Sequence, residues 1–207
     1  EEDWACVGYS FTNANPETYI SRANLFTDYG LFLDPARRGE AVHLPGNTLA
    51  YRREILEQFG DELSKVISPD FVIQDLLRKR GLKMCLDDRA KAAHQNFESL
   101  AGMLAANFHY CRIFASARAD SQRWSGWKRL FYGLMVPAGA PLIKFLRLVR
   151  HLGWGRGLIK LVAYFPVIAS VYLWSAVGES LGYLAGVGDS DRIFDWYEVN
   201  ADRISRR

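Results

Sequence analysis

The sequence is poor in cysteine, and its cysteines are not arranged in pairs. Cys6, Cys85 and Cys111 are the three cysteines among 207 residues. An odd and widely spaced set fits neither a disulfide framework nor a zinc site built from paired cysteines. We therefore interpret them as reduced thiols in a cytosolic setting.

Several common catalytic signatures are also missing. The sequence has no phosphate-binding glycine loop, no Gly-x-Ser-x-Gly elbow and no His-Glu-x-x-His segment, which excludes the enzyme classes that depend on them. Asp189-Ser190-Asp191 has the letters of an acidic metal motif, but it lies in a polar turn without further ligands, so we do not predict a metal there. No secretory signal opens the chain at Glu1, and we expect the chain to be the C-terminal portion of something longer.

A third absence is local, because no Asp or Glu occurs between Asp120 and Glu179. The basic residues inside this stretch are Arg123, Lys128, Arg129, Lys144, Arg147, Arg150, Arg156 and Lys160. A block of one charge sign calls for its own explanation, and attraction to an anionic membrane surface supplies one. Nucleic acid would also attract it, but the apolar runs between the cations favour lipid, and we expect no nucleic-acid partner.

The same stretch contains two apolar runs. Residues 161–178 are uncharged and would form a helix of about 27 Å, marginal for a hydrocarbon core of roughly 30 Å. This run is interpreted as a membrane span, an interfacial helix or a buried helical hairpin. Residues 130–143 are interrupted by Pro137 and Pro141, and we predict an interfacial helix too short to span. The basic block places this region at the cytoplasmic face of the membrane.

Short apolar runs alternate with helical patterns in the first half of the chain. The predicted strands are 5–11, 48–51 and 82–86, and the predicted helices are about 16–33, 52–60, 70–80 and 98–118. Strands interleaved with helices indicate an α/β fold, although few strands are visible. We therefore predict three parts, an α/β part over 1–120, a basic and apolar membrane-associated helical part over 121–188 and a polar tail over 189–207.

Asp70 is the candidate general base. It stands at the start of a predicted helix, where backbone N–H groups and the helix dipole favour an ionised carboxylate. A carboxylate in such a place can remove the proton of an attacking hydroxyl. The alternative interpretation is that Asp70 only caps the helix, which is a common role for aspartate.

The residues around Asp70 form an ordered pattern. An apolar run leads to a Gly-Asn pair and an aromatic-Arg-Arg segment, and then come an acid, a helix rich in Leu and Arg that ends in Gly, a strand and a His. The residues on these positions are Gly46, Asn47, Tyr51, Arg52, Arg53, Asp70, Arg78, Gly81 and His94. In order and spacing the segment from about 5 to 118 resembles the acceptor-side half of a family 2 glycosyltransferase of the GT-A fold.

The resemblance implies roles for some of these residues. Asp70 matches the catalytic base, and Gly46 and Asn47 match the loop on the acceptor side, which continues to Arg52 and Arg53. His94 matches a histidine that in some members helps to hold the divalent metal, Mg or Mn, or the nucleotide diphosphate. Considered alone, His94 would be interpreted as a hydrogen-bonded loop histidine, and only the surrounding pattern makes the metal or diphosphate role an equal alternative.

The pattern also departs from the family. Pro69 precedes Asp70 where many members have Glu, and the family's Asp-x-Asp motif for metal and nucleotide would have to lie before Glu1. The resemblance implies inverting transfer of a sugar from a nucleotide donor to a lipid or glycan acceptor, as in synthesis of cell-envelope polysaccharide, with the donor-binding half absent. The alternative hypothesis is a non-catalytic, membrane-anchored module that works with a separate donor-binding partner.

Overall fold

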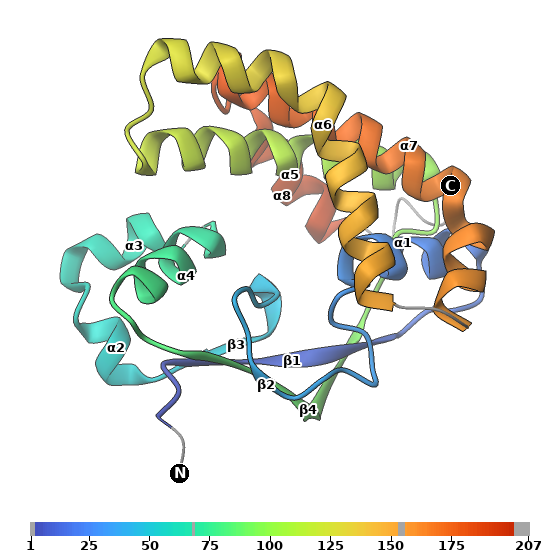
Figure 1. Cartoon of the computed structure of the whole chain (residues 1–207), viewed down its shortest axis with the longest axis horizontal. Coiled ribbons are helices and arrows are strands. Elements are labelled where there is room, and N and C mark those ends of the chain that lie inside the picture. The colour runs from blue at the N-terminus through green and yellow to red at the C-terminus, as the bar shows by residue number, and fades with distance from the viewer. Residues whose placement is uncertain (1–2, 68, 153–155, 201–207) are drawn as a thin grey trace. The chain divides into compact units, whose positions relative to one another are not determined.

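The computed structural model describes residues 3–67, 69–152 and 156–200, which belong to two compact units (Figure 1). The first, which we call the sheet unit, comprises Glu1–Thr12 and Phe32–His94. The second, the helical unit, comprises Asn13–Leu31 and Gln95–Arg207. The predicted change of character near residue 120 falls inside the helical unit, at the end of its helix α5 (Leu100–Ser121).

The sheet unit contains a four-stranded sheet in the order β2-β4-β1-β3. The strands are β1 (Cys6–Asn13), β2 (Gly39–Glu40), β3 (Leu49–Tyr51) and β4 (Met84–His94). β1 pairs with β3, and β2 with β4, in antiparallel register. β1 and β4 run in the same direction, because the Ala5 N–H donates to the Lys83 carbonyl at one end while Ser10 Oγ contacts the Ala90 carbonyl further along both strands. The chain is therefore mixed α/β, as predicted.

Short helices complete the sheet unit. They are the 3₁₀ turns η1 (Gly46–Thr48) and η2 (Gly60–Glu62) and the α-helices α2 (Arg53–Glu57), α3 (Leu63–Val66) and α4 (Asp70–Lys79). α4 matches its predicted bounds and is followed by Gly81 with a φ of 75°, a left-handed conformation that glycine adopts without strain. The buried core residues are Ala5, Cys6, Leu44, Ile55, Phe59, Ile73, Leu77, Met84 and Leu86.

The helical unit is built around one long helix. Its helices are α1 (Tyr19–Tyr29), α5 (Leu100–Ser121), α6 (Gly126–Leu152), α7 (Arg156–Ala185) and α8 (Ser190–Val199). α7 packs against α5, α6 and α1, and α8 packs against α5. α1 begins later than predicted, because Thr18 is its N-cap and its side chain accepts a hydrogen bond from the Ser21 N–H. The side chain of Asn15, near which the helix was predicted to begin, instead bonds to the backbone of Asn96.

α6 corrects the prediction of an interrupted apolar segment, since it continues through Pro137 and Pro141 for 27 residues. Pro137 has no N–H to offer to the carbonyl of Gly133, four residues earlier. Ser180 of α7 replaces that donor, because its Oγ lies 2.6 Å from the Gly133 carbonyl oxygen. A hydroxyl from the neighbouring helix thus satisfies the backbone group that the proline leaves free.

α5 and α7 approach each other through glycines of α7. A Cβ added to Gly178 would lie 2.2 Å from the backbone oxygen of Phe108, and one added to Gly182 would lie 2.4 Å from the backbone oxygen of Arg112. The Arg112 side chain then donates to the carbonyl of Gly186 at 2.9 Å. Residues spaced four apart lie on one helix face, so these glycines form a continuous seam with α5.

Among the described residues, Gly126–Leu152 and Gly157–Ala185 are helices long and apolar enough to cross a membrane. Length and composition alone do not distinguish a membrane helix from the core helix of a soluble protein, which can have the same properties. The distribution of side chains around each helix is therefore more informative than its total hydropathy.

The seam gives a direct stability test. Gly178→Ala places a methyl group against the α5 backbone, and we expect a loss of about 1–3 kcal/mol of unfolding free energy because the helices must separate. Gly139→Ala in α6 is the matched control, since nothing lies within 4 Å of a Cβ there, and it should stabilise the protein by about 0.5–1 kcal/mol. Thermal unfolding of the two variants in detergent measures both effects, and equal stabilities would contradict the seam.

Candidate functional site

The turn η1 and the start of α4 meet at Gly46 and Asp70. A Cβ added to Gly46 would lie 2.4 Å from the Asp70 Cγ and 2.6 Å from its Oδ2. Only a glycine allows the backbone of η1 to approach the carboxylate this closely. Two residues that the resemblance assigned to the site are therefore in direct contact, although 24 positions separate them (70 − 46).

Gln74 connects the same two segments. Its Oε1 accepts from the Leu44 N–H and its Nε2 donates to the Leu44 carbonyl, both at 2.9 Å. The same Nε2 lies 3.1 Å from the Asp70 Oδ2. Because Gln74 is 1% exposed, these bonds form away from water, where leaving them unmade is costly. One buried amide thus fixes both the loop before η1 and the carboxylate of the candidate base.

The half-buried position of Asp70 affects its ionisation. Burial raises the pKa of the Asp70 carboxyl above its usual value, and hydrogen bonds from the backbone N–H groups of Asp70 and Phe71 oppose that shift. Burial is the larger effect. A raised pKa makes the carboxylate a stronger base than an exposed aspartate, which is the property that a general base requires.

Two buried hydroxyl groups, those of Thr48 and Tyr51, lie close to this place. Thr48 Oγ1 is a buried side-chain oxygen without a hydrogen-bond partner within the described ranges. Tyr51 lies opposite Cys6 in the β1–β3 pair, and the thiol is the polar side chain that its hydroxyl meets, although a thiol is a weak partner. Burial raises the pKa of Tyr51, and it raises that of the Cys6 thiol to about 12, so both stay protonated at neutral pH. A polar ligand here would supply hydrogen bonds that the protein does not make itself.

The other predicted acceptor-side residues lie at the surface. Asn47 is the exposed middle residue of η1, directly after Gly46. Arg52 forms ion pairs with Asp3 and Glu54. Arg53 pairs with Glu57 one turn later, 2.7 Å from Nε to Oε1. Both arginines, at the start of α2, are therefore engaged by neighbouring carboxylates at the protein surface.

His94 is the last residue of β4, which extends well past its predicted end at residue 86. Its ring stands edge-on to Phe11, with the ring centroids 5.8 Å apart. Phe11 lies three residues along β1 from Gly8, which faces Leu44, a separation of about 10 Å. His94 is therefore at a different place along the strand from the contact between Gly46 and Asp70.

A metal was expected from the resemblance. No group of three or more His, Cys, Asp or Glu side chains that could hold a metal ion occurs within 3–67, 69–152 and 156–200. His94 thus belongs to no such group of three ligands within these ranges, and the described residues do not by themselves fit a divalent metal. We assign no step in this chain to one.

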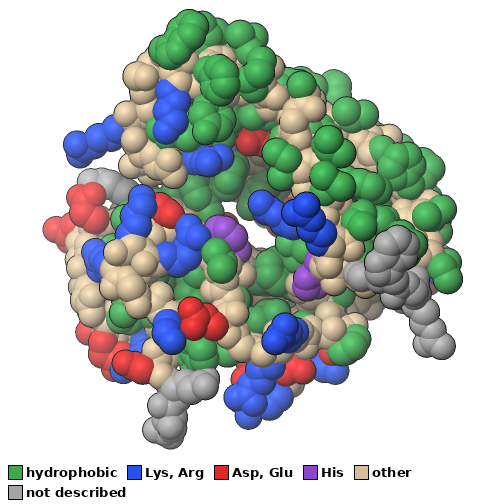
Figure 2. Space-filling model, in the orientation of Figure 1, with side chains coloured by type: hydrophobic (Ala, Val, Ile, Leu, Met, Phe, Trp, Pro, Cys, Tyr) green, Lys and Arg blue, Asp and Glu red, His purple; other side chains and the backbone are tan. Residues whose placement is uncertain are grey.

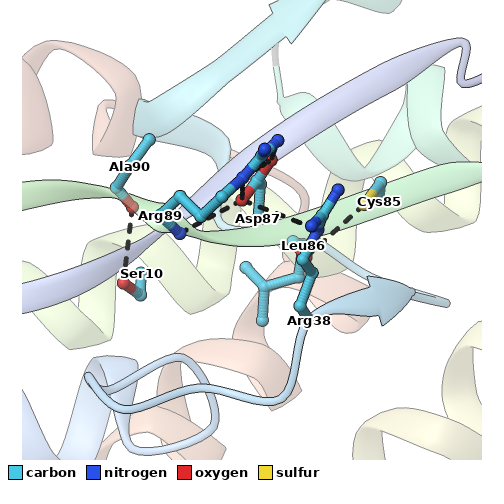
Figure 3. A network of polar contacts seen from close by, with 7 residues as sticks. All are labelled: Ser10, Arg38, Cys85, Leu86, Asp87, Arg89 and Ala90. Carbon is cyan, nitrogen blue, oxygen red and sulfur yellow. Dashed lines mark hydrogen bonds and ion pairs between the residues drawn. The ribbon is translucent and has the colours of Figure 1, made fainter. Parts of the chain in front are cut away.

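A further polar network was not predicted from the sequence. Asp87 on β4 contacts Arg89 at 2.6 Å and Arg38 at 3.9 Å (Figure 3). Its bonds to Arg89 lower the pKa of Asp87 to about 2. Arg38 immediately precedes β2, so the network attaches this short edge strand to β4. The adjacent acids in Asp87-Asp88-Arg89 were the only sequence signal for it.

No protein-family model matches the chain, and comparisons with curated proteins and with solved structures return no match. The resemblance to family 2 glycosyltransferases therefore rests on the residue pattern. The contact between Gly46 and Asp70 and the bonds of Gln74 supply the local geometry that any functional interpretation must use.

The bonds of Gln74 predict a large effect of its removal. Gln74→Leu keeps the size of the side chain but leaves the Leu44 N–H and carbonyl without partners, and each unsatisfied buried group costs about 1–3 kcal/mol. We expect a loss of about 2–4 kcal/mol in unfolding free energy. Gln58→Leu, at an exposed position, should change it by less than about 0.5 kcal/mol. Chemical denaturation measures the unfolding free energy of both variants. Similar losses would contradict the role given to the buried Gln74 bonds.

The pKa of Asp70 predicts how stability depends on pH. Because the folded-state pKa is raised, the stability from the protonated carboxyl is full below about pH 4 and is lost as pH rises through the folded-state value. Asp70→Asn should therefore match the wild type at pH 4 and melt at a higher temperature at pH 7.

Asp75 on the same helix provides a control of opposite sign. Bonds from Lys79 and Arg78 lower its pKa, so its contribution is present above about pH 4 and is lost on acidification. Asp75→Asn should melt slightly lower than the wild type at pH 7 and converge with it in acid. Scanning calorimetry at several pH values measures the melting temperatures of both variants. If the differences from the wild type did not change with pH, the pKa shifts of Asp70 and Asp75 would be refuted.

Proposed function

We propose that this chain is the acceptor-side part of a membrane-associated, inverting glycosyltransferase of the family 2 type, with a GT-A-like sheet unit. In this proposal Asp70 removes the proton from an acceptor hydroxyl as that oxygen attacks the anomeric carbon of a nucleotide-sugar. The nucleoside diphosphate is the leaving group. A donor-binding half, with the family's metal motif, belongs to residues outside this chain or to a partner subunit.

The observation that carries the proposal is the joint attachment of Asp70 and the η1 loop to Gln74. A general base works only when it is held in hydrogen-bond reach of the hydroxyl that it deprotonates. Gln74 holds the carboxylate and the backbone before Gly46 in one hydrogen-bonded unit. An acceptor bound at this loop would meet a carboxylate of raised basicity in a fixed position.

The buried hydroxyls of Thr48 and Tyr51 support a hydroxyl-rich acceptor. Thr48 ends η1 and Tyr51 ends β3, and within the described part of the chain the Thr48 hydroxyl has no hydrogen-bond partner while that of Tyr51 has only the Cys6 thiol. A sugar or a lipid-linked glycan supplies complementary hydroxyl groups. The apolar, basic helices of the other unit are suited to the cytoplasmic face of a membrane, where nucleotide-sugars and lipid-linked acceptors meet.

The test uses the protein as its gene encodes it, assayed in membranes for nucleoside diphosphate release from a panel of nucleotide-sugars. Asp70→Asn should lower turnover by about 10²–10⁴-fold, the usual contribution of a general base. Asp75→Asn, which alters an ion-paired surface carboxylate five residues away, should leave turnover within about twofold of wild type.

Retention of turnover by Asp70→Asn would exclude Asp70 as the base. Calorimetric titration of nucleotide-sugars addresses the alternative. A non-catalytic module would bind no donor and release no diphosphate in the wild type, and that result would replace the enzymatic proposal with a structural one.

A further inference from the structure

The outer face of α6 is apolar over its whole length. Trp127 is 76% exposed, and Leu134 and Leu142 are each more than half exposed. The large apolar residues that α6 exposes are Trp127, Leu130, Phe131, Leu134, Met135, Leu142, Ile143 and Leu146. In Figure 2 hydrophobic side chains gather over the part of the molecule where Figure 1 draws α6. A row of exposed large apolar side chains along one helix is a mark of an interaction surface for protein or membrane.

α7 exposes a second apolar face beside the first. Ile159 is 70% and Val162 is 68% exposed, and the face continues through Phe165, Trp174 and Leu181. α6 and α7 are antiparallel neighbours, because Gly133 contacts Leu184 near one end while the rings of Phe145 and Phe165 meet near the other, with centroids 5.6 Å apart. Their exposed faces therefore belong to one hairpin, which we call the α6–α7 hairpin.

The charges of the hairpin are of one sign on its exposed surface. Glu179 is the one acidic residue in the sequence of the two helices, and it is 7% exposed and lies 3.8 Å from Lys144. The exposed cations stand near both ends of the hairpin. Lys128 is at one end, and Arg147, Arg150 and Lys160 are at the other.

We propose that the α6–α7 hairpin lies in the plane of an anionic membrane leaflet, with its apolar face among the acyl chains, and does not cross the bilayer. In this orientation the cations at both ends reach phosphate groups of the same leaflet. A crossing hairpin would carry Arg147, Arg150 and Lys160 to the far side, against the strong preference of such residues for the cytoplasmic side.

Two further features oppose crossing. The uncharged part of α6 between Arg129 and Lys144 is only about 21 Å long, which is short of a hydrocarbon core of roughly 30 Å. The inner face of α7 packs closely against the backbone of α5 at Gly178 and Gly182. If α7 crossed, α5 would enter the bilayer beside it with the charged groups of Arg112 and Arg118, at high cost.

Labelling with a membrane-impermeant maleimide distinguishes the two orientations. Lys160→Cys and Ser121→Cys place thiols at exposed positions near opposite ends of the hairpin, whereas the native cysteines are buried. We expect both thiols to react in inside-out vesicles and neither to react in intact cells. Reaction of Lys160→Cys from outside the cell, with Ser121→Cys reacting only from inside, would overturn the proposal. Detergent-solubilised samples confirm that both thiols are reactive.

Vesicle flotation tests the lipid preference. The purified chain should float with phosphatidylcholine vesicles that contain phosphatidylglycerol and bind at least tenfold more weakly to phosphatidylcholine alone. Combined replacement of Arg147, Arg150 and Lys160 by Gln should weaken binding by about fivefold for each charge removed. The same replacement of Arg37, Lys79 and Lys83, exposed cations of the sheet unit, is the matched control and should have no effect. Equal binding to both vesicles, or none, would contradict the inference.

This inference rests on the membrane association in the proposed function, but it is independent of the chemistry at Asp70. The labelling pattern and flotation of Asp70→Asn should match those of the wild type. If that variant retains turnover while the labelling result holds, only the catalytic proposal fails. If the labelling result fails while Asp70→Asn is inactive, only the in-plane orientation fails.

Discussion

The structure depends on side chains that satisfy buried backbone groups wherever regular hydrogen bonding stops. Gln74 does this for the segment before η1, which is neither strand nor helix when it passes the start of α4. Ser180 does it for the Gly133 carbonyl that a proline leaves free inside α6. Arg112 does it for the Gly186 carbonyl, directly after the end of α7 at Ala185. An unpaired buried backbone group costs about as much as several surface interactions provide. These polar contacts therefore decide where the apolar elements can pack.

The sequence predicted those helices and strands whose ends are set by residues within the same segment. Helix α4 was predicted almost to the residue, because an apolar face, basic residues in the last turn and the left-handed Gly81 all act within one segment. The continuation of α6 through Pro137 and Pro141 was not predictable in the same way. The donor that replaces the missing N–H is Ser180, more than forty residues later in the sequence, and no local rule can supply it. The full length of β4 was missed for a related reason, since its second half is fixed by pairing with β1.

The candidate site shows the same division. The resemblance placed Gly46 and Asp70 in one site, and the structure brings them into contact. It gave no indication of Gln74, which lies among the apolar positions of α4 and carries no motif. A buried amide within an apolar face is the signal that would have identified it, because such a group must find partners nearby. Arg52 and Arg53 follow the family pattern, yet their charges are matched by Asp3, Glu54 and Glu57 at the surface.

Total hydropathy could not separate a spanning helix from one that lies between protein and lipid. α7 has two apolar faces. One packs against α5 through glycines, and the other is exposed through residues such as Val162 and Leu173. A hydropathy average over the whole helix combines both faces and therefore cannot tell which of them is exposed. The position of charge relative to each end is the property that differs, because a span needs one end that can be translocated. The α6–α7 hairpin has cations at both ends, and its single acid is buried against Lys144. The two helices pass a test of length and composition for a bilayer crossing, but the short uncharged part of α6 and the placement of the cations favour one anionic surface.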